Sequence, residues 1–179
     1  MNLLTFFIFL LVSLSAAAQP QVVNFKQLQQ SLPQGDIQNY TRGRTYGETS
    51  TMMGFVTSWA QVTYLSSADS NSGTISVKIT DMLNISSYMS IPLSPQGNSN
   101  PSTVSGYKNT VSHNNMNVLE TYDSTSRQAK LQLTLATRFL IEINGSGVTS
   151  PGVLYLFLDR VDVDSLEKIA QTAAGSQGR

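Results

Sequence analysis

The side chains of this chain restrict nucleophilic catalysis. The sequence holds one histidine, His113, and no cysteine. A Ser–His–Asp triad needs that histidine as its base, and the G-x-S-x-G turn that presents a serine nucleophile does not occur. The lack of cysteine excludes a thiol nucleophile, disulfides and Cys-ligated metal sites. We therefore expect no catalytic residue at His113.

Paired carboxylates are the second route to chemistry, because a glycosidase uses two of them as acid and base. The sequence places Asp123 in a turn-forming run, and strand alternation places Glu120 and Glu142 on a polar sheet face. Solvated side chains account for every candidate, so no catalytic pair is predicted. The carboxylates considered are Glu48, Asp81, Glu120, Asp123 and Glu142.

A calcium site is the third candidate, since Asp159, Asp162 and Asp164 lie close together in the sequence. They lack the glycine and the terminal glutamate of an EF-hand loop. Aspartate is also common at helix N-termini, and Asp164 with Glu167 fits a capping box. Helix capping is the favoured interpretation.

Copper ligation by methionine would suit an exported protein. However, no M-x-x-M array occurs, and methionine commonly fills gaps in cores. We expect no metal and no cofactor. The methionines considered beside His113 are Met52, Met53, Met82, Met89 and Met116.

The residues from Tyr40 to Met53 hold the densest group of basic and aromatic side chains and are expected to form a loop. Arginine and tyrosine dominate binding hot spots, so this loop is the candidate docking site. The alternative is a solvated loop without a partner. A second loop, Leu83 to Gly106, is rich in Pro, Ser and Asn and is expected to contribute little binding energy. The candidate partner-binding residues are Arg42, Arg44, Tyr46 and Glu48.

Charge is low and balanced. Eleven basic and eleven acidic residues give no net charge, and charged residues make up only 12% of the chain, against about 25% in ordinary domains. No basic patch appears in the sequence. Nucleic-acid binding and attraction to anionic lipid both need clustered cations, so neither is expected.

The N-terminus is typical of an export signal. Leu3 to Ala18 contains no charged side chain and ends on three alanines. Residues 1–18 are therefore interpreted as a signal peptide cleaved near Ala18, with a retained anchor as the alternative. The apolar core is shorter than the ~20 residues that span a bilayer. We expect no transmembrane segment in the mature chain and a periplasmic or extracellular location.

Apolar periodicity predicts the elements of one α+β domain over residues 19–174. Helical spacing indicates helices over 24–32, 151–158 and 165–174, with Asp164 as the cap of the last. Alternation indicates strands over 55–65, 74–80, 107–113, 116–122, 129–135 and 138–143. Residues 34–51 are expected to be loop or irregular strand, and 175–179 a disordered tail. The pattern favours a two-layer sandwich, an antiparallel sheet covered on one face by the N- and C-terminal helices.

Several short runs resemble a group of small exported bacterial proteins, often lipoproteins, without an assigned activity. They are Gly47–Phe55 (GETSTMMGF), Ala60–Tyr64 (AQVTY), Ile75–Asp81 (ISVKITD), Gly106–Lys108, Tyr122–Asp123 and Arg138–Gly147 (RFLIEINGSG). This chain departs from the group by lacking the lipoprotein cysteine and by its longer segment at 90–105. The pattern is also similar to PsbP/Mog1-like α+β domains, which implies an accessory or binding role by analogy only.

These observations lead to two functional hypotheses. The first is an exported, non-catalytic accessory or binding module of the bacterial cell envelope, monomeric, whose partner is an envelope protein or a small ligand. The alternative is a secreted or periplasmic hydrolase that acts on a polymer such as a glycan. The lack of a catalytic motif favours the first.

Overall fold

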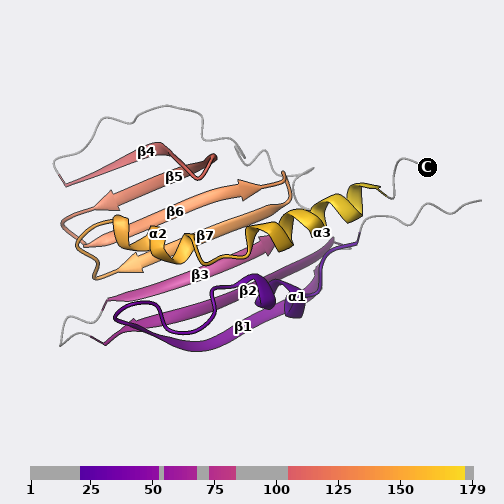
Figure 1. Cartoon of the computed structure of the whole chain (residues 1–179), viewed down its shortest axis with the longest axis horizontal. Helices are drawn as coiled ribbons and strands as arrows, with labels where there is room; N and C mark the ends of the chain where they lie inside the picture. Colours follow the sequence, from indigo (N-terminus) through magenta and orange to yellow (C-terminus); the bar gives the residue numbers. More distant parts are fainter. Residues whose placement is uncertain (1–20, 53–54, 68–72, 84–104, 176–179) are drawn as a thin grey trace, which may run out of the picture.

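A computed structural model of the chain describes residues 21–52, 55–67, 73–83 and 105–175. Within these ranges it has one seven-stranded antiparallel sheet and three helices, an α+β fold (Figure 1). The strand order is β1-β2-β3-β7-β6-β5-β4, so β1 and β4 are the edges. The strands are β1 (Tyr40–Met52), β2 (Phe55–Ser66), β3 (Thr74–Asp81), β4 (Gly106–His113), β5 (Met116–Asp123), β6 (Gln128–Leu135) and β7 (Phe139–Ser146).

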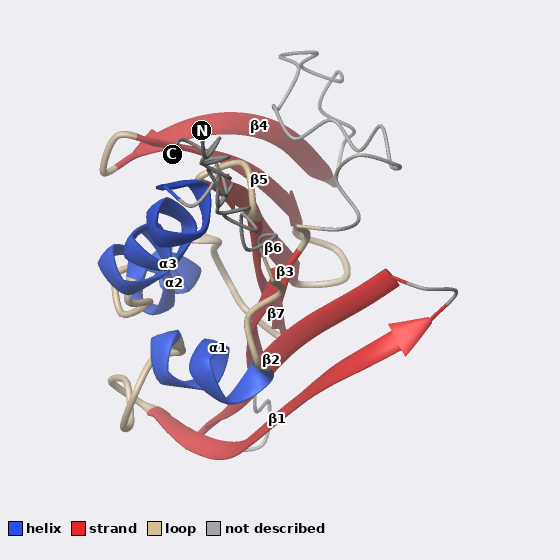
Figure 2. Ribbon diagram, turned by 90° about the vertical axis from the view of Figure 1, so that its right-hand side faces the viewer, coloured by secondary structure: helices blue, strands red, loops and turns tan. Residues whose placement is uncertain are grey.

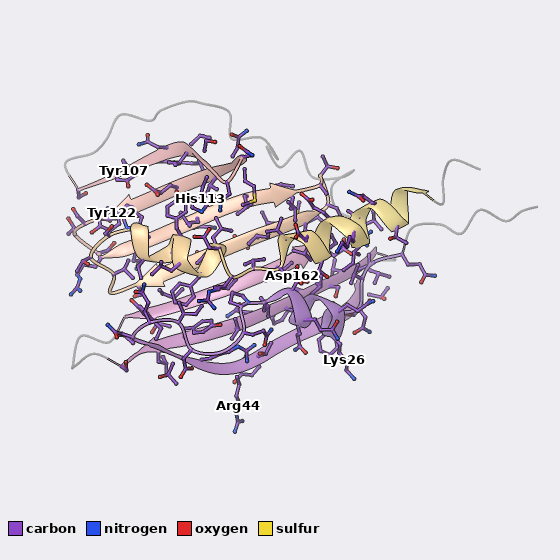
Figure 3. The ribbon with its side chains drawn as sticks, in the orientation of Figure 1. Lys26, Arg44, Tyr107, His113, Tyr122 and Asp162 are labelled. Atoms are coloured by element: carbon purple, nitrogen blue, oxygen red, sulfur yellow. The ribbon has the colours of Figure 1, made fainter. Side chains whose placement is uncertain are left out.

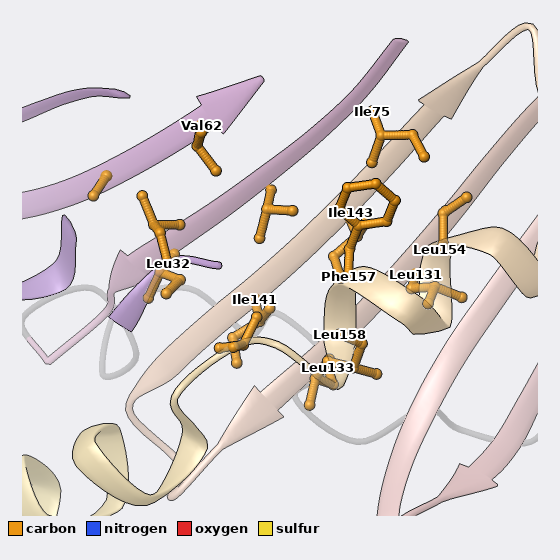
Figure 4. Close-up of a cluster of buried hydrophobic side chains, with 14 of the residues drawn as sticks. Leu32, Val62, Ile75, Leu131, Leu133, Ile141, Ile143, Leu154, Phe157 and Leu158 are labelled. Carbon is orange, nitrogen blue, oxygen red and sulfur yellow. The ribbon is translucent and has the colours of Figure 1, made fainter. Parts of the chain in front are cut away.

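One face of the sheet, here called the core face, is apolar. In β3, β6 and β7 buried and partly exposed residues alternate along the whole strand, as the sequence predicts for half-buried strands. The inward row Ala129, Leu131, Leu133 and Leu135 is buried as expected. Helix residues complete the hydrophobic core. Phe157, for example, packs among Ile143, Leu131 and Leu154 (Figure 4). The other face, the polar face, carries the alternate side chains.

The three helices are α1 (Phe25–Ser31), α2 (Gly152–Leu158) and α3 (Val163–Gly175). Figure 2 draws all of them on the same side of the sheet. Asn24 caps α1, since its side-chain oxygen accepts a hydrogen bond from the Lys26 N–H at 2.9 Å. The predicted cap of α3 is wrong by two residues. Asp162, not Asp164, accepts the Ser165 N–H at 2.9 Å, and Asp164 lies in the first turn of the helix.

The largest correction to the predicted elements is β1. Residues 34–51 were expected to be loop or irregular strand, but Tyr40–Met52 forms a 13-residue edge strand paired with β2. The sequence of β1 does not alternate between apolar and polar residues, because both of its faces carry polar side chains and two glycines interrupt the pattern. At Gly47 an added Cβ would lie 2.8 Å from the Phe25 ring and 2.8 Å from the Trp59 carbonyl oxygen. Glycine is thus needed for close packing there, not for a turn.

The other strands fall where the sequence places them, with bounds that differ by one to three residues. The Asn114–Asn115 break between β4 and β5 is confirmed as a turn in which both residues have positive φ, 48° and 62°. The expected signal peptide, the 84–104 stretch and residues 176–179 lie outside the described residues. Within the described residues, no helix is long and apolar enough to cross a bilayer.

Candidate functional site

The four expected partner-binding residues lie on the edge strand β1, not on a loop. Arg42 faces the core side. Its Nε donates to the Pro33 carbonyl at 3.0 Å, and its Nη2 donates to Thr45 Oγ1 at 2.9 Å. Arg42 therefore lies on a strand and not on the predicted loop, and its guanidinium ties Pro33 to β1.

Arg44, Tyr46 and Glu48 form an exposed row at alternate positions of β1. Tyr46 is 58% exposed, one of two large apolar side chains so open to solvent in the described part of the chain. Arg44 projects away from the sheet edge in Figure 3. None of the three makes a side-chain hydrogen bond or ion pair with another described residue. The structure thus brings three of the four predicted residues together on one surface.

A second surface, here called the sheet hollow, lies on the polar face where β3, β7, β6 and β5 run side by side. Its volume is about 500 Å³ and it is open to solvent. No sequence motif marks the residues of this hollow, because only the pairing of the strands brings them together. The polar residues that line it are Thr74, Ser76, Thr121, Asp123, Ser126, Gln128, Lys130, Asn144 and Ser146.

Both charged side chains of the sheet hollow already have partners. Lys130 Nζ donates to Glu142 Oε1 at 2.8 Å on the same face. Asp123 Oδ1 accepts the backbone N–H groups of Ser126 and Thr125, at 3.2 and 2.8 Å. These hydrogen bonds lower the pKa of Asp123 from its usual value. The groups left to meet a ligand are hydroxyls and amides.

Asp81 is not solvated as expected but is the most buried carboxylate among the described residues. It is 1% exposed, and its two oxygens accept Arg138 Nη2 at 2.7 Å and Nε at 3.0 Å. The same carboxylate accepts the Val23 N–H at 2.8 Å, and Arg138 donates to the Gln21 carbonyl at 2.8 Å. This bidentate pair fastens the segment before α1 to the sheet.

The prediction that Glu120 lies on the polar face is also wrong. Glu120 is 7% exposed and lies on the core face, in phase with buried Val118. Tyr107 donates its hydroxyl to Glu120 Oε1 at 2.5 Å. Burial and this carboxylate together raise the pKa of Tyr107 to about 12. Glu120 is two residues from Val118 on the same strand, and this spacing in the sequence indicates that both side chains lie on the core face.

Tyr155 of α2 joins Glu120 from the helix side. Its hydroxyl oxygen is buried and lies outside hydrogen-bond geometry with any described residue. Burial raises the pKa of Tyr155, and the nearby Glu120 carboxylate raises it further. Glu120 thus lies between the Tyr107 and Tyr155 side chains and has no open access for a substrate.

His113, the last residue of β4, lies beside Tyr155. Its Nε2 lies 2.6 Å from Asp159 Oδ1, and its ring packs against Tyr155 with centroids 4.6 Å apart. Asn114 Nδ2 donates to the same Asp159 oxygen at 3.0 Å. In the part of the chain that the structure describes, no serine hydroxyl contacts this histidine. The contacts join the β4–β5 turn to the end of α2.

The three aspartates considered for calcium separate into different roles. Asp159 binds His113, Asp162 caps α3, and Asp164 lies in the first turn of that helix. They border an open hollow of about 470 Å³ between the β4–β5 turn and α3. Among the described residues, no three His, Asp or Glu side chains are arranged to hold a metal ion. Of the methionines, Met82 is buried and Met116 packs against the core, whereas Met53 and Met89 lie outside the described residues.

Comparison of the chain with protein families, with curated proteins and with solved structures finds no match.

Proposed function

We propose that this chain is a non-catalytic binding module that takes a neutral, hydroxyl-rich ligand, such as a glycan segment, in the sheet hollow. The observation that carries this proposal is the composition of that hollow. Four adjacent strands contribute hydroxyl and amide side chains to one hollow of about 500 Å³ that is open to solvent. Hydroxyls and amides each offer donors and acceptors, which matches the hydroxyl groups of a sugar polymer.

The electrostatics of the sheet hollow support a neutral ligand over an ion. Lys130 is balanced by Glu142, and Asp123 is held by its own turn. A phosphate or a carboxylate would find no unpaired cation among the lining residues. Binding would depend on many weak hydrogen bonds, which suits a modest affinity and a repetitive polymer.

The hydrolase alternative receives less support. Such an enzyme needs an acid and a base at the edge of an open cleft. Glu120 and Asp81 are nearly completely buried and already hydrogen-bonded, and the sheet hollow contains a single carboxylate, Asp123. We therefore propose a binding role and not catalysis.

We further propose that the scaffold is a two-layer sandwich that acts outside the cytoplasm. The shared burial of the core face and of Leu28, Phe157 and Leu166 from the three helices supports the first point. The uncharged run from Leu3 to Ala18 supports the second. N-terminal sequencing of the exported protein should begin at or near Gln19, and a membrane-bound form that begins at Met1 would contradict export by cleavage.

Calorimetric titration with soluble tetrasaccharides of N-acetylglucosamine and of glucose tests the proposed ligand class. The variant Gln128→Ala/Asn144→Ala removes two amides from the sheet hollow and should weaken binding at least tenfold, since two hydrogen bonds contribute about 1 kcal/mol each.

Gln132→Ala is the matched control. Gln132 lies on the same strand and the same face as Gln128 but does not line the hollow. It should bind as the parent chain does. Equal losses in both variants, or no heat of binding with either sugar, would contradict the proposal.

A further inference from the structure

We propose that two copies of this chain associate edge to edge through β1, antiparallel about a two-fold axis at Tyr46. This inference does not rest on the proposed function, and it replaces the expectation of a monomer. Among the strands that the structure describes, β1 pairs with β2 alone, so its other side is an edge of the sheet. An open strand edge is a template for pairing with another chain.

Part of that edge is already occupied. Tyr40 exchanges two backbone hydrogen bonds with Ile37, at 2.9 and 3.0 Å, and the Arg42 N–H donates to Asp36 Oδ1 at 2.8 Å. The register shift between Arg42 and Thr45 then marks a bulge. The edge that remains for a second copy runs from Arg44, the last residue of this bulge, to the end of β1.

The direction of the backbone groups beyond the bulge follows from the pairing of β2. The Ser66 N–H donates to the Gly73 carbonyl at 2.9 Å, toward β3. Residues of β2 in the opposite phase, such as Gln61, must direct their backbone groups toward β1, because these directions alternate along a strand. Tyr46 faces Gln61, so its own N–H and C=O point inward, to β2.

It follows that Thr45, Gly47 and Thr49 direct their N–H and C=O groups to the outer edge. None of these groups makes a backbone hydrogen bond to a described residue outside the strands. In antiparallel pairing about Tyr46, Thr45 of one copy exchanges hydrogen bonds with Gly47 of the other. The Tyr46 residues then face each other as a non-hydrogen-bonded pair, about 4.5 Å apart at Cα.

The side chains select this register. Pairing about Tyr46 places Arg44 opposite Glu48 of the second copy, and does so twice. If the two-fold axis passed through Glu48 instead, the Glu48 residues of the two copies would face each other. If it passed through Arg44, the two Arg44 residues would face each other. Opposite charges across strands stabilise a pair, whereas like charges destabilise it. Since Arg44 and Glu48 have no ion-pair partner among the described residues, their charges are available for this contact.

Disulfide cross-linking gives the first test, and the lack of native cysteine makes it clean. Tyr46→Cys should form a covalent dimer on mild oxidation, because paired Cα atoms in this geometry are within disulfide range. Leu65→Cys is the matched control, since Leu65 is 56% exposed against 58% for Tyr46 but lies on β2. Equal cross-linking of both variants, or none with Tyr46→Cys, would contradict the proposal.

Charge reversal gives the second test, read by sedimentation equilibrium over a range of concentrations. The parent chain should dimerise, and Arg44→Glu or Glu48→Arg should each raise the dimer dissociation constant at least tenfold. The double variant Arg44→Glu/Glu48→Arg restores the opposition of charges and should recover the parent value. A parent chain that stays monomeric throughout, as expected if the charges and the bulge only protect the edge, overturns the proposal. A double variant as weak as either single one also overturns it.

Discussion

Asp81 and Arg138 form the contact on which the N-terminal part of the described structure depends. The ion pair is almost completely buried, and each partner also bonds to backbone in the 21–23 segment. Desolvation makes such pairs costly to build, so their net contribution is small compared with the cost of breaking them. Removal of one partner leaves the other charge buried without compensation.

Asp81→Asn should therefore destabilise the chain by about 3–5 kcal/mol, because Arg138 loses its counter-charge at 5% exposure. Urea unfolding, followed by circular dichroism, measures this loss. Replacement of both residues in Asp81→Leu/Arg138→Met should recover part of the stability, since no charge then remains in the core.

The Lys130–Glu142 pair is the control, because it has the same bond length within 0.1 Å but lies on the polar face with Lys130 40% exposed. Lys130→Ala should cost less than about 1 kcal/mol. A similar loss for Asp81→Asn and Lys130→Ala would mean that burial does not determine the strength of these pairs here.

At the scale of single elements, β6 alternates between the core face and the polar face in every residue. Leu133 is buried against Ile141, whereas its neighbour Thr134 lies on the polar face. Leu133→Asp should prevent folding, because an unpaired charge in the core costs several kcal/mol. Thr134→Asp should stay within about 1 kcal/mol of the parent chain. Thermal unfolding of both variants decides whether the faces are assigned correctly.

The β6–β7 turn carries backbone strain that glycine would relieve. Ala136 and Thr137 have φ of 49° and 53°, inside a turn closed by the Arg138 N–H and the Leu135 carbonyl at 3.0 Å. Left-handed conformations cost non-glycine residues about 1 kcal/mol each, and more for a β-branched one. Ala136→Asn/Thr137→Gly introduces the preferred sequence for two such residues. It should raise the unfolding free energy by about 1 kcal/mol, and a lowered melting temperature would contradict this.

The elements that the sequence predicts well are those with one apolar and one polar face. β3, β6 and β7 alternate between the two faces in every residue, and α1 buries Leu28 at the helical spacing that predicts it. β1 lacks this alternation, because a long edge strand built around Gly43 and Gly47 buries few side chains of its own. Local patterns therefore do not distinguish it from a loop.

The site residues follow the same logic. The exposed row Arg44, Tyr46 and Glu48 was found from residue type alone. The Asp81–Arg138 pair was not, because its partners are 57 positions apart and only the pairing of β3 with β7 brings them together. The sheet hollow was missed for the same reason. Its side chains come from four strands, and none of them is unusual by itself.

For the molecule as a whole, tyrosines that are wholly or partly buried make stability depend on alkaline pH. The pKa values of Tyr107, Tyr155, Tyr64 and Tyr40 are all raised, with burial the largest cause in each case. A raised pKa in the folded state means that the folded chain holds its proton more tightly than the unfolded chain. The resulting stabilisation is complete below pH 10, the ordinary tyrosine value, and is lost as pH rises through the folded-state values.

The melting temperature should accordingly stay level up to about pH 9.5 and then fall steadily between pH 10 and 12. Each tyrosine that ionises only on unfolding lowers the unfolding free energy by at most about 1.4 kcal/mol per pH unit, and partial exposure reduces this.

Tyr155→Phe and Tyr107→Phe each remove one such proton, so the fall of the melting temperature with pH should become shallower in both variants. Tyr107→Phe should also be less stable at neutral pH, because Glu120 loses its 2.5 Å hydrogen bond. Thermal scans from pH 8 to 11.5 measure these slopes, and cysteine-free protein avoids thiol chemistry at high pH. A slope equal to that of the parent chain in Tyr155→Phe and Tyr107→Phe would show that the tyrosines around Glu120 do not control the alkaline limit of this fold.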